Sequence, residues 1–530
     1  KMYGEELMTA FREFKSIWDP QWKMNPGKVI TPYSATENLR LGAEYQPWSP
    51  PSHFRFPQDE GRLDRALLRC VGVGRCRRMD GGTMCPSFMV TREEEHSTRG
   101  RARLLFEMFQ GEVIPDRWKN EPVKEALDLC LSCKGCKGDC PVGVDMATYK
   151  AEFLSHYYEG RLRPLAAYTM GWIHLWSRLA AFAPGLANLG MIAGKRLLGI
   201  APERRMPRYA PETFVQRFRK RQATHSGSGE PHSRVLLWPD TFNNYFLPET
   251  AMAAVEVLEH AGYHVTIPSR PLCCGRPLYD WGFLGMAKAQ LREILDALRP
   301  EIEEGIPLIG LEPSCVSVFR DELLNLFPDD PLARRLASSA MTLSEFIVRE
   351  GDRFPIPPLE RKALVQAHCH HKAIMRFEPE EAVFRRMGLD YEHPDSGCCG
   401  MAGAFGFEAK HYDIAMRAGE RVILPRIREA PLETIIIANG FSCREQIAQG
   451  TDREAIHLAQ VLQMAIREGT RDSKPVPEKE YIEPKPLVPG LTKVVAVGVG
   501  AAFLGGLVAW SRRKKRRARK PTGFGKRTDT

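Results

Sequence analysis

The run "CLSCKGCKGDCP", residues 130–141, constrains this chain more than any other feature. Its cysteines follow the spacing Cys-x-x-Cys-x-x-Cys-x-x-x-Cys-Pro of bacterial iron–sulfur proteins. Two-residue gaps let three thiolates curl around one cluster, whereas the cysteine before proline reaches a neighbouring cluster. A zinc site uses Cys-x-x-Cys pairs but rarely this third cysteine and Cys-Pro. The run therefore predicts iron–sulfur ligation by Cys130, Cys133, Cys136 and Cys140.

A second motif, "RCVGVGRCRRMDGGTMCP" at 69–86, has one cysteine fewer. Cys70 and Cys76 stand at the outer positions and Cys85 precedes a proline, but Val73 occupies the middle cysteine position. Three cysteines suffice for a [3Fe–4S] cluster, or for a [4Fe–4S] cluster whose fourth ligand is solvent, Asp80 or another oxygen. The alternative is that the two outer cysteines are inert.

The two motifs predict exchanged ligands. In two-cluster ferredoxins each Cys-Pro cysteine binds the cluster of the other motif. Applied here, Cys140 joins the upstream site and Cys85 joins the downstream site. The expected ligand sets are Cys70, Cys76 and Cys140 for the upstream cluster, and Cys85, Cys130, Cys133 and Cys136 for the downstream cluster.

The 14 cysteines of this 530-residue chain are grouped, which favours metal binding over disulfide cross-linking. The net charge of +10 is concentrated at one end: residues 511–530 hold ten Lys/Arg and one acidic residue, which leaves the rest of the chain close to neutral. A neutral body with a basic tail argues against a nucleic-acid-binding protein.

Residues 234–470 alternate short apolar runs with helical patterns, which predicts a parallel sheet. "RVLLW" and "YHVTIP" are expected strands, with helices around Pro248–Ala261 and Leu284–Leu298. The pattern occurs twice: "KALVQAHC", "SGCCGMAG" and "TIIIANGFSC" repeat "RVLLW", "LCCGRP" and "IPLIGLEPSC" about 125 residues later. The sequence therefore predicts a duplicated α/β domain.

Each repeat places cysteines after its strands, where ligands gather in open α/β sheets. The second repeat offers Cys369, Cys398, Cys399 and Cys443, which predict a cluster or a redox-active thiol site. The first repeat offers only Cys273, Cys274 and Cys315, because Thr241 stands where Cys369 stands, and the evidence for a metal site is weaker there. The alternative is a buried, inert cysteine pair. Three histidines flank the second site and are either ordinary loop residues or a metal or proton site: His368, His370 and His371.

These motifs resemble the iron–sulfur oxidoreductase family over about residues 61–466. That family includes iron–sulfur subunits of anaerobic glycerol-3-phosphate dehydrogenase, glycolate oxidase and heterodisulfide reductase. "GTMCPSFMVTREEEHSTRGRARLL", "LWPDTFNNYF", "LEPSC" and "NGFSCREQI" look most like the iron–sulfur half of fused FAD-linked, D-lactate dehydrogenase-like proteins. Thr241, Glu312 and Gly440 occupy slots where the family's full repeat has cysteines, which puts its noncubane cluster in doubt.

The resemblance implies an oxidoreductase module that passes electrons from a flavin, which oxidises a 2-hydroxy acid of the D-lactate or glycolate type, to a membrane acceptor such as quinone. "FKSIWDPQWKMNPGKVI" is similar to the end of an FAD-linked oxidase domain, so FAD and its binding residues are expected on a missing or partner domain. No catalytic residue is assigned in this chain. Two alternatives remain open: thiol–disulfide catalysis at Cys398 and Cys399, or a degenerate membrane scaffold.

Residues 494–510 are apolar and uncharged but are shorter than the roughly 20 residues of a spanning helix. They predict either a short span or an interfacial helix, and the basic tail predicts binding to anionic lipid. Residues 168–200 are either a second membrane contact or a core helix pair. The expected location is the cytoplasmic side of a bacterial cell membrane, peripheral or anchored by this C-terminal segment.

The sequence therefore predicts a multidomain protein: a helical, ferredoxin-like two-cluster domain followed by the duplicated Cys-Cys-Gly α/β domain. The expected divisions are 1–32, the end of an FAD-linked oxidase domain; 33–60, a linker; 61–160, the dicluster domain; 161–233, membrane-proximal helices and a linker; 234–350 and 360–470, the two repeats; 471–492, a linker; 493–511, an apolar helix; and 512–530, the basic tail.

Overall fold

The computed structural model describes residues 3–34, 36–37, 41–42, 45–224, 233–469 and 475–485. The chain divides into two units at Ser49–Pro50. The first unit contains α1 (Glu5–Trp18), which confirms the helix expected at the start of the chain. Asp19 ends this helix and accepts hydrogen bonds from the backbone N–H groups of Lys23 and Met24, both at 2.9 Å. No residue of α1 is buried, and its apolar face is exposed at Phe14, Ile17 and Trp18.

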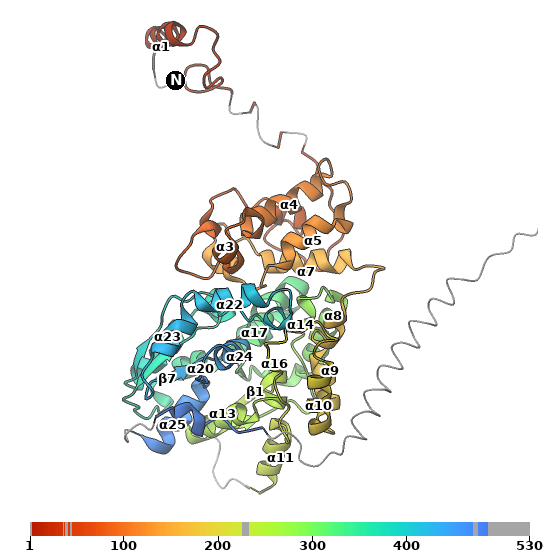
Figure 1. The fold of residues 1–530 in the computed structure, drawn as a ribbon, viewed down its shortest axis with the longest axis vertical. Coiled ribbons are helices and arrows are strands. Elements are labelled where there is room, and N and C mark those ends of the chain that lie inside the picture. Colours follow the sequence, from red (N-terminus) through yellow and green to blue (C-terminus); the bar gives the residue numbers. More distant parts are fainter. Residues whose placement is uncertain are drawn as a thin grey trace, which may run out of the picture. The chain divides into compact units, whose positions relative to one another are not determined.

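The second unit begins with the helical dicluster region, drawn in orange in Figure 1. Its helices are α2 (Leu63–Leu67), α3 (Pro86–Thr91), α4 (Thr98–Gln110), α5 (Glu121–Asp128), α6 (Gly135–Asp139) and α7 (Met146–Tyr157). Residues 50–60 differ from the expected linker, because Phe54 and Phe56 are buried and the carboxylate of Glu152 accepts hydrogen bonds from two backbone N–H groups, those of His53 and Phe54. This segment is therefore part of the packed region.

Three short helices follow along one edge of the unit (Figure 1): α8 (Leu165–Thr169), α9 (Ile173–Ala180) and α10 (Pro184–Gly194). They are largely half-exposed rather than a buried core pair. The segment α11 (Phe214–Thr224) then leads into the α/β region. Within the described ranges no helix is long and apolar enough to cross a bilayer, and the predicted segments 493–511 and 512–530 lie outside those ranges.

The α/β region contains two parallel sheets, as the repeat pattern predicts. The first has the order β2-β1-β3-β4 and the second β6-β5-β7, so the first three strands of each repeat share one topology. The strands are β1 (Arg234–Trp238), β2 (His264–Thr266), β3 (Leu308–Gly310), β4 (Ala340–Thr342), β5 (Lys362–Val365), β6 (Asp390–Glu392) and β7 (Ile435–Ile437). In register, Arg234 pairs with His264 and Trp238 with Gly310.

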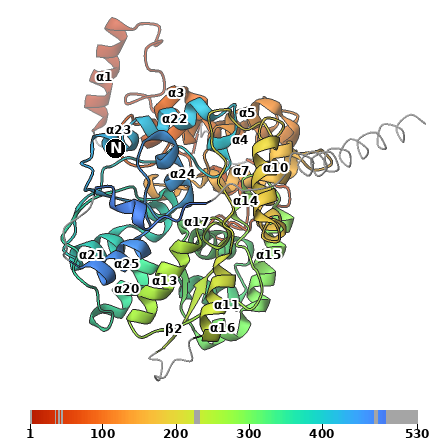
Figure 2. The same ribbon diagram turned by 60° about the horizontal axis from the view of Figure 1, so that its bottom comes forward.

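Helices cover both sheets, and Figure 2 shows them around the strands from a second side. In the first repeat they are α12 (Thr241–Tyr245), α13 (Pro248–His260), α14 (Arg276–Tyr279), α15 (Leu284–Ala297), α16 (Arg299–Glu304), α17 (Pro313–Ser317), α18 (Leu323–Leu326), α19 (Pro331–Ser339) and α20 (Leu343–Glu350). In the second they are α21 (Glu378–Arg386), α22 (Tyr412–Glu420), α23 (Ile423–Glu429), α24 (Phe441–Gly450) and α25 (Leu458–Glu468).

One apolar core joins the two repeats. It combines Val235 and Ile309 of the first sheet with Val365 and Ile437 of the second, and it is filled by α13, α20, α21 and α25. Local signals fix where these helices begin: Pro248 opens α13, and Thr342 and Glu345 form a capping box at the start of α20. Because the sheets share this core, the loops after their strands are held in fixed positions.

Candidate metal centres

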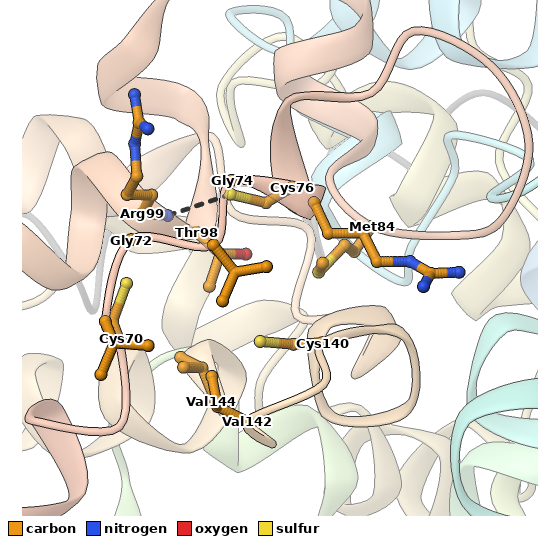
Figure 3. A pocket seen from close by; sticks show the side chains of 13 residues that line it. Cys70, Gly72, Gly74, Cys76, Met84, Thr98, Arg99, Cys140, Val142 and Val144 are labelled. Carbon is orange, nitrogen blue, oxygen red and sulfur yellow. Dashed lines mark hydrogen bonds between the residues drawn. The ribbon is translucent and has the colours of Figure 1, made fainter. Parts of the chain in front are cut away.

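The upstream site forms as the motifs predict. Cys70, Cys76 and Cys140 line one cavity of about 290 Å³, and their sulfur atoms point into its common space (Figure 3). Val73 lines the same cavity and is 58% exposed, so the corner where a fourth cysteine would stand faces solvent. Asp80 does not line the cavity and lies instead within electrostatic reach of Arg421. Of the oxygen ligands considered for this corner, Asp80 is therefore not positioned for the role.

The downstream site gathers the other set. Ser132 and Lys134 adopt left-handed backbone conformations (φ +51° and +58°), which curl the loop between the cysteines. The thiols of this set lie close enough to raise one another's pKa. The set is Cys85, Cys130, Cys133 and Cys136. The exchange of the two Cys-Pro cysteines is thus the arrangement that the fold favours.

Helix N-termini face both dicluster sites. The backbone N–H of Arg99, in the first turn of α4, donates to Cys76 Sγ at 3.4 Å (Figure 3). The N–H of Met146, which begins α7, donates to Cys136 Sγ, also at 3.4 Å. Amide donors and the positive end of a helix dipole stabilise negative charge on sulfur, and such hydrogen bonds tune the potential of a bound cluster.

Burial makes these thiols poor thiolates on their own. It raises the pKa of Cys85 to about 11 and that of Cys136 well above its ordinary value. A metal offsets this cost because it deprotonates the thiols that coordinate it. All seven cysteines of the region are free of disulfides. The donor type, the convergence and the cavity therefore fit iron–sulfur clusters.

Thr98 is a site residue that the sequence motifs do not reveal. Its hydroxyl lies 2.7 Å from Cys85 Sγ, and the residue also lines the upstream cavity. Thr98 is buried at the start of α4, where Ser97 caps the helix. It therefore touches a downstream ligand while facing the upstream site. Only the serine–threonine pair at an expected helix start could have hinted at it.

The second Cys-Cys-Gly repeat brings four buried thiols together. Cys369 contacts Cys398, Cys398 contacts Cys399, and Cys399 contacts Cys443 at the start of α24. The hydrogen bond from the Cys398 thiol holds the pKa of Cys369 well below its ordinary value, with further lowering by His368 and His370. The site is thus electrostatically prepared for at least one thiolate.

The three histidines divide in two. His368, Cys369 and His370 present ligand atoms within 4.8 Å of one another, a grouping able to hold a metal ion. His371 is different: burial lowers its pKa to about 3, and its ring packs edge-on against Phe377. The fold therefore treats His371 as a neutral core residue.

The first repeat has a reduced set. Cys274 and Cys315 approach to 3.0 Å between sulfurs. The hydroxyl of Thr241 lies 3.8 Å from Cys273 Sγ, in the place that corresponds to Cys369. Three sulfurs and one hydroxyl oxygen thus replace the four sulfurs of the second repeat, which weakens the case for a cluster here.

Two of the positions that lack an expected cysteine have structural roles. The ring of His368 packs on Gly440: a Cβ at that glycine would lie 2.2 Å from His368 Cδ2. Glu312 of the first repeat accepts a hydrogen bond from the N–H of Phe441 at 2.8 Å, and its other oxygen lies 4.0 Å from His368 Nε2. Glu312 and Gly440 therefore connect the two repeats through His368, and no side chain fits at Gly440.

The dicluster region contacts both repeats at its cysteine loop. Cys133 shares a small apolar cluster with Cys369 and Cys398. On the other side Lys134 Nζ is buried between Asp145 Oδ2 and Asp321 Oδ2, each at 2.8 Å. The apolar contact places the downstream site beside the four-thiol site of the second repeat, whereas the ionic contact binds the first repeat.

Comparisons with known proteins agree with this architecture. A 4Fe-4S dicluster domain matches residues 66–144, and a cysteine-rich domain matches twice, at residues 241–320 and 364–448. The chain thus carries a 4Fe–4S dicluster domain followed by two copies of the cysteine-rich domain, as the resemblance implies.

Similar proteins are oxidoreductases or their iron–sulfur subunits. D-2-hydroxyglutarate dehydrogenase of Pseudomonas putida is 28% identical over 525 residues, which cover 88% of this chain and 50% of that protein. The glycolate oxidase iron-sulfur subunit of Escherichia coli is 25% identical, covering 76% of this chain and 95% of that subunit. A subunit of its anaerobic glycerol-3-phosphate dehydrogenase, the one designated C, is 26% identical, covering 51% and 67%. The chain therefore spans about half the length of the D-2-hydroxyglutarate dehydrogenases that it matches.

Proposed function

We propose that this chain is the iron–sulfur electron-transfer part of an FAD-linked dehydrogenase for a D-2-hydroxy acid, and that it passes electrons to a membrane quinone. D-lactate, glycolate and, from the relatives' names, D-2-hydroxyglutarate are the substrate candidates. Bound iron–sulfur clusters supply one-electron transfer. The flavin and the substrate site belong to another domain or subunit.

The observation that carries the proposal is the succession of three cysteine sites. Thr98 touches a ligand of the downstream site and lines the upstream one. Cys133 of the downstream site shares an apolar cluster with Cys369 of the second repeat. The protein's part is to hold these sites close together, to keep water out, and to donate backbone N–H groups to the sulfurs of Cys76 and Cys136.

The first unit supports a flavin-domain partner. The apolar face of α1 is exposed at Phe14, Ile17 and Trp18 and contacts no core. An amphipathic helix that buries nothing in its own unit is expected to complete another domain, here the FAD-linked oxidase domain.

Iron quantitation with low-temperature EPR on anaerobically purified protein tests the cluster assignment. About seven to eight irons per chain are expected from the dicluster domain alone, and about eleven or more if the second repeat also holds a cluster. A [3Fe–4S] signal in the oxidised protein would identify an open corner at Val73. Zinc, or no metal, in protein purified without oxygen would overturn the proposal.

A membrane acceptor is supported by the surface of α8–α10 and the chain that flanks them. Eight large apolar side chains are exposed there, and Phe182 is 89% exposed. The set is Leu162, Leu165, Leu175, Leu179, Phe182, Leu189, Ile192 and Leu197. Residues 161–208 contain eight Lys/Arg and only one acidic residue, Glu203. An apolar surface within a basic segment suits an anionic lipid interface.

Sedimentation with phosphatidylglycerol-containing vesicles tests this contact. The double variant L179E/F182E should lower the bound fraction at least fivefold, because both side chains would carry charge into the lipid interface. Leu432→Glu is the matched control, since Leu432 is exposed in the second repeat, away from this surface. Equal binding by both variants would leave the basic tail as the membrane contact and reject this surface.

A second candidate function is thiol–disulfide catalysis in the second repeat. One observation favours it: the hydrogen bond from Cys398, with help from Cys443, holds the pKa of Cys399 well below its ordinary value. A substrate-induced paramagnetic signal, with loss of turnover in Cys399→Ser, is expected for this chemistry. Neither is expected if the site only transfers electrons.

A further inference from the structure

A second cavity lies beside Cys130, between the dicluster region and the loop that follows the second Cys-Cys-Gly. It holds about 660 Å³ of empty space and is here termed the Cys130 cavity. Cys130 and Ser132 form part of one wall, and Ala402 and Phe405 form part of the opposite wall. It is thus separate from the upstream cavity and next to the downstream site.

The walls of the Cys130 cavity suit a flat ring. Tyr158, Trp281 and Phe405 line it. The Phe405 ring is already stacked on His411, with ring centres 4.2 Å apart and planes 10° from parallel. Aromatic faces of this kind stack well on planar conjugated ligands.

Hydrogen-bonding groups stand at the same cavity, and one lacks a partner. His411 Nε2 pairs with Asp128 Oδ2 at 3.0 Å, and Lys410 also pairs with Asp128. The His411 side chain is only 3% exposed, yet its Nδ1 makes no hydrogen bond to any residue that the structure describes. Its nearest acid is Glu408, whose Oε1 lies 3.7 Å away. A buried polar atom without a partner, on the wall of a cavity, calls for a ligand or water.

Backbone strain is concentrated at the same walls. Ser132 and Ala402 both line the cavity, and both adopt left-handed conformations, with φ of +51° and +43°. Such conformations cost non-glycine residues on the order of 1–3 kcal/mol each and cluster at ligand sites. Here they come from two separate loops, so the cavity itself is their shared feature.

The cavity also reaches the apolar surface described above. Pro164 lines it, and the adjoining Leu162 and Leu165 are exposed members of that surface. A lipophilic molecule held at the surface would therefore need to cross only the first turn of α8 to enter.

We propose that the Cys130 cavity binds the head group of a quinone-class acceptor, with the ring against Phe405 and Trp281 and its carbonyl oxygens toward the donors Lys410 and His411. This inference rests on the proposed function. The reduced cluster held by the Cys130 set is the reductant: two electrons, delivered singly, and two protons from solvent through these polar groups convert the quinone to the quinol. No bond to the protein forms or breaks.

Binding of menadione or a short-chain ubiquinone to the anaerobically purified full chain tests the site. Binding should quench tryptophan fluorescence saturably, and Trp281→Phe should remove most of that quench. Ala404→Trp fills the cavity, which Ala404 lines, and should weaken binding at least tenfold. Ala409→Trp is the matched control, because Ala409 is exposed in the same loop but does not line the cavity.

Re-oxidation of dithionite-reduced protein separates the possible failures. With Ala404→Trp, the rate of re-oxidation by the quinone should fall at least tenfold, while the rate with ferricyanide should stay within twofold. Quinone binding that is equal in Ala404→Trp and Ala409→Trp would overturn the site but not the quinone acceptor. No binding or re-oxidation by quinone in the unaltered chain, with normal ferricyanide re-oxidation, would overturn both.

Discussion

Replacing Lys134 by methionine should weaken the attachment of the cysteine loop to the first repeat. The ammonium group is surrounded by Asp145, Asp321 and Glu322, at 2.8, 2.8 and 3.3 Å, and its side chain is 1% exposed. Methionine keeps the length of the stem but leaves three buried carboxylates short of one positive charge.

The size of the loss follows from what remains. Removing one partner of a buried ion pair costs about 3–5 kcal/mol. Lys137 still pairs with Asp321, and Arg276 Nη1 still donates to Glu322 at 2.8 Å. These two cations compensate in part, so we expect a loss at the lower end, about 3 kcal/mol in the free energy of unfolding.

Urea unfolding followed by circular dichroism, on protein purified without oxygen, measures this loss. Lys220→Met is the control, because the Lys220 side chain is 75% exposed and its ion pair with Glu212 should contribute about 0–1 kcal/mol. Asp321→Asn provides a second variant if Lys134→Met does not fold. A difference of less than about 1 kcal/mol between Lys134→Met and the control would refute the reasoning.

The same network gives a pH signature. Burial opposes ionisation, but Lys134 and Lys137 hold the pKa of Asp145 and Asp321 below their ordinary values, so this stabilisation is present above about pH 4 and lost as the pH falls. Burial also disfavours the charge of Lys134, yet the carboxylates raise its pKa, so its contribution is lost above about pH 10. The difference between wild type and Lys134→Met should therefore be greatest between about pH 5 and 9 and should narrow in acid.

Three further predictions concern single residues. Cys140→Ser should remove the upstream cluster and lower iron by about three to four per chain, and unchanged iron would contradict its exchanged role. Gly400→Ala should cost about 2–4 kcal/mol in thermal or urea unfolding, because φ is +92° and the new Cβ would lie 2.0 Å from a carbonyl oxygen. Gly285→Ala, with nothing within 4 Å, should not destabilise the protein. Gly440→Cys should add no iron and should destabilise, because the new side chain would collide with His368; an extra cluster would contradict this.

Much of the architecture could be predicted because its signals are local. Continuous apolar runs such as Ile435–Ile437 identify buried strands, and the duplicated Cys-Cys-Gly pattern implies equal topology in both repeats. The strand Ala340–Thr342 was not predicted, because three residues of ordinary polarity become a strand only through pairing with β3. Phe54 and Phe56 are buried for a similar reason: a proline-rich segment suggests a linker unless a partner for its backbone, here Glu152, is known.

The site divides in the same way. Cysteine spacing predicts which thiols lie near one another, because the chain between them is short or ends at one edge of a sheet. The roles of Thr98, Lys134 and Glu312 depend on contacts between distant segments, and no local pattern marks them. Asp80 had only proximity in sequence to support it as a ligand, and the fold directs that residue toward Arg421.

The burial of the Lys134 network determines how salt should act on this protein. Mobile ions screen exposed charges over a Debye length of about 8–10 Å at physiological ionic strength but have little effect on charges shielded from solvent. Lys134, Asp321 and Glu322 are almost fully enclosed, so the junction between the cysteine loop and the first repeat should keep its geometry in high salt. Attachment to an anionic bilayer relies on exposed basic groups and should be released. A salt titration would thus separate electron transfer within the chain, which should be insensitive to ionic strength, from delivery at the membrane, which should not.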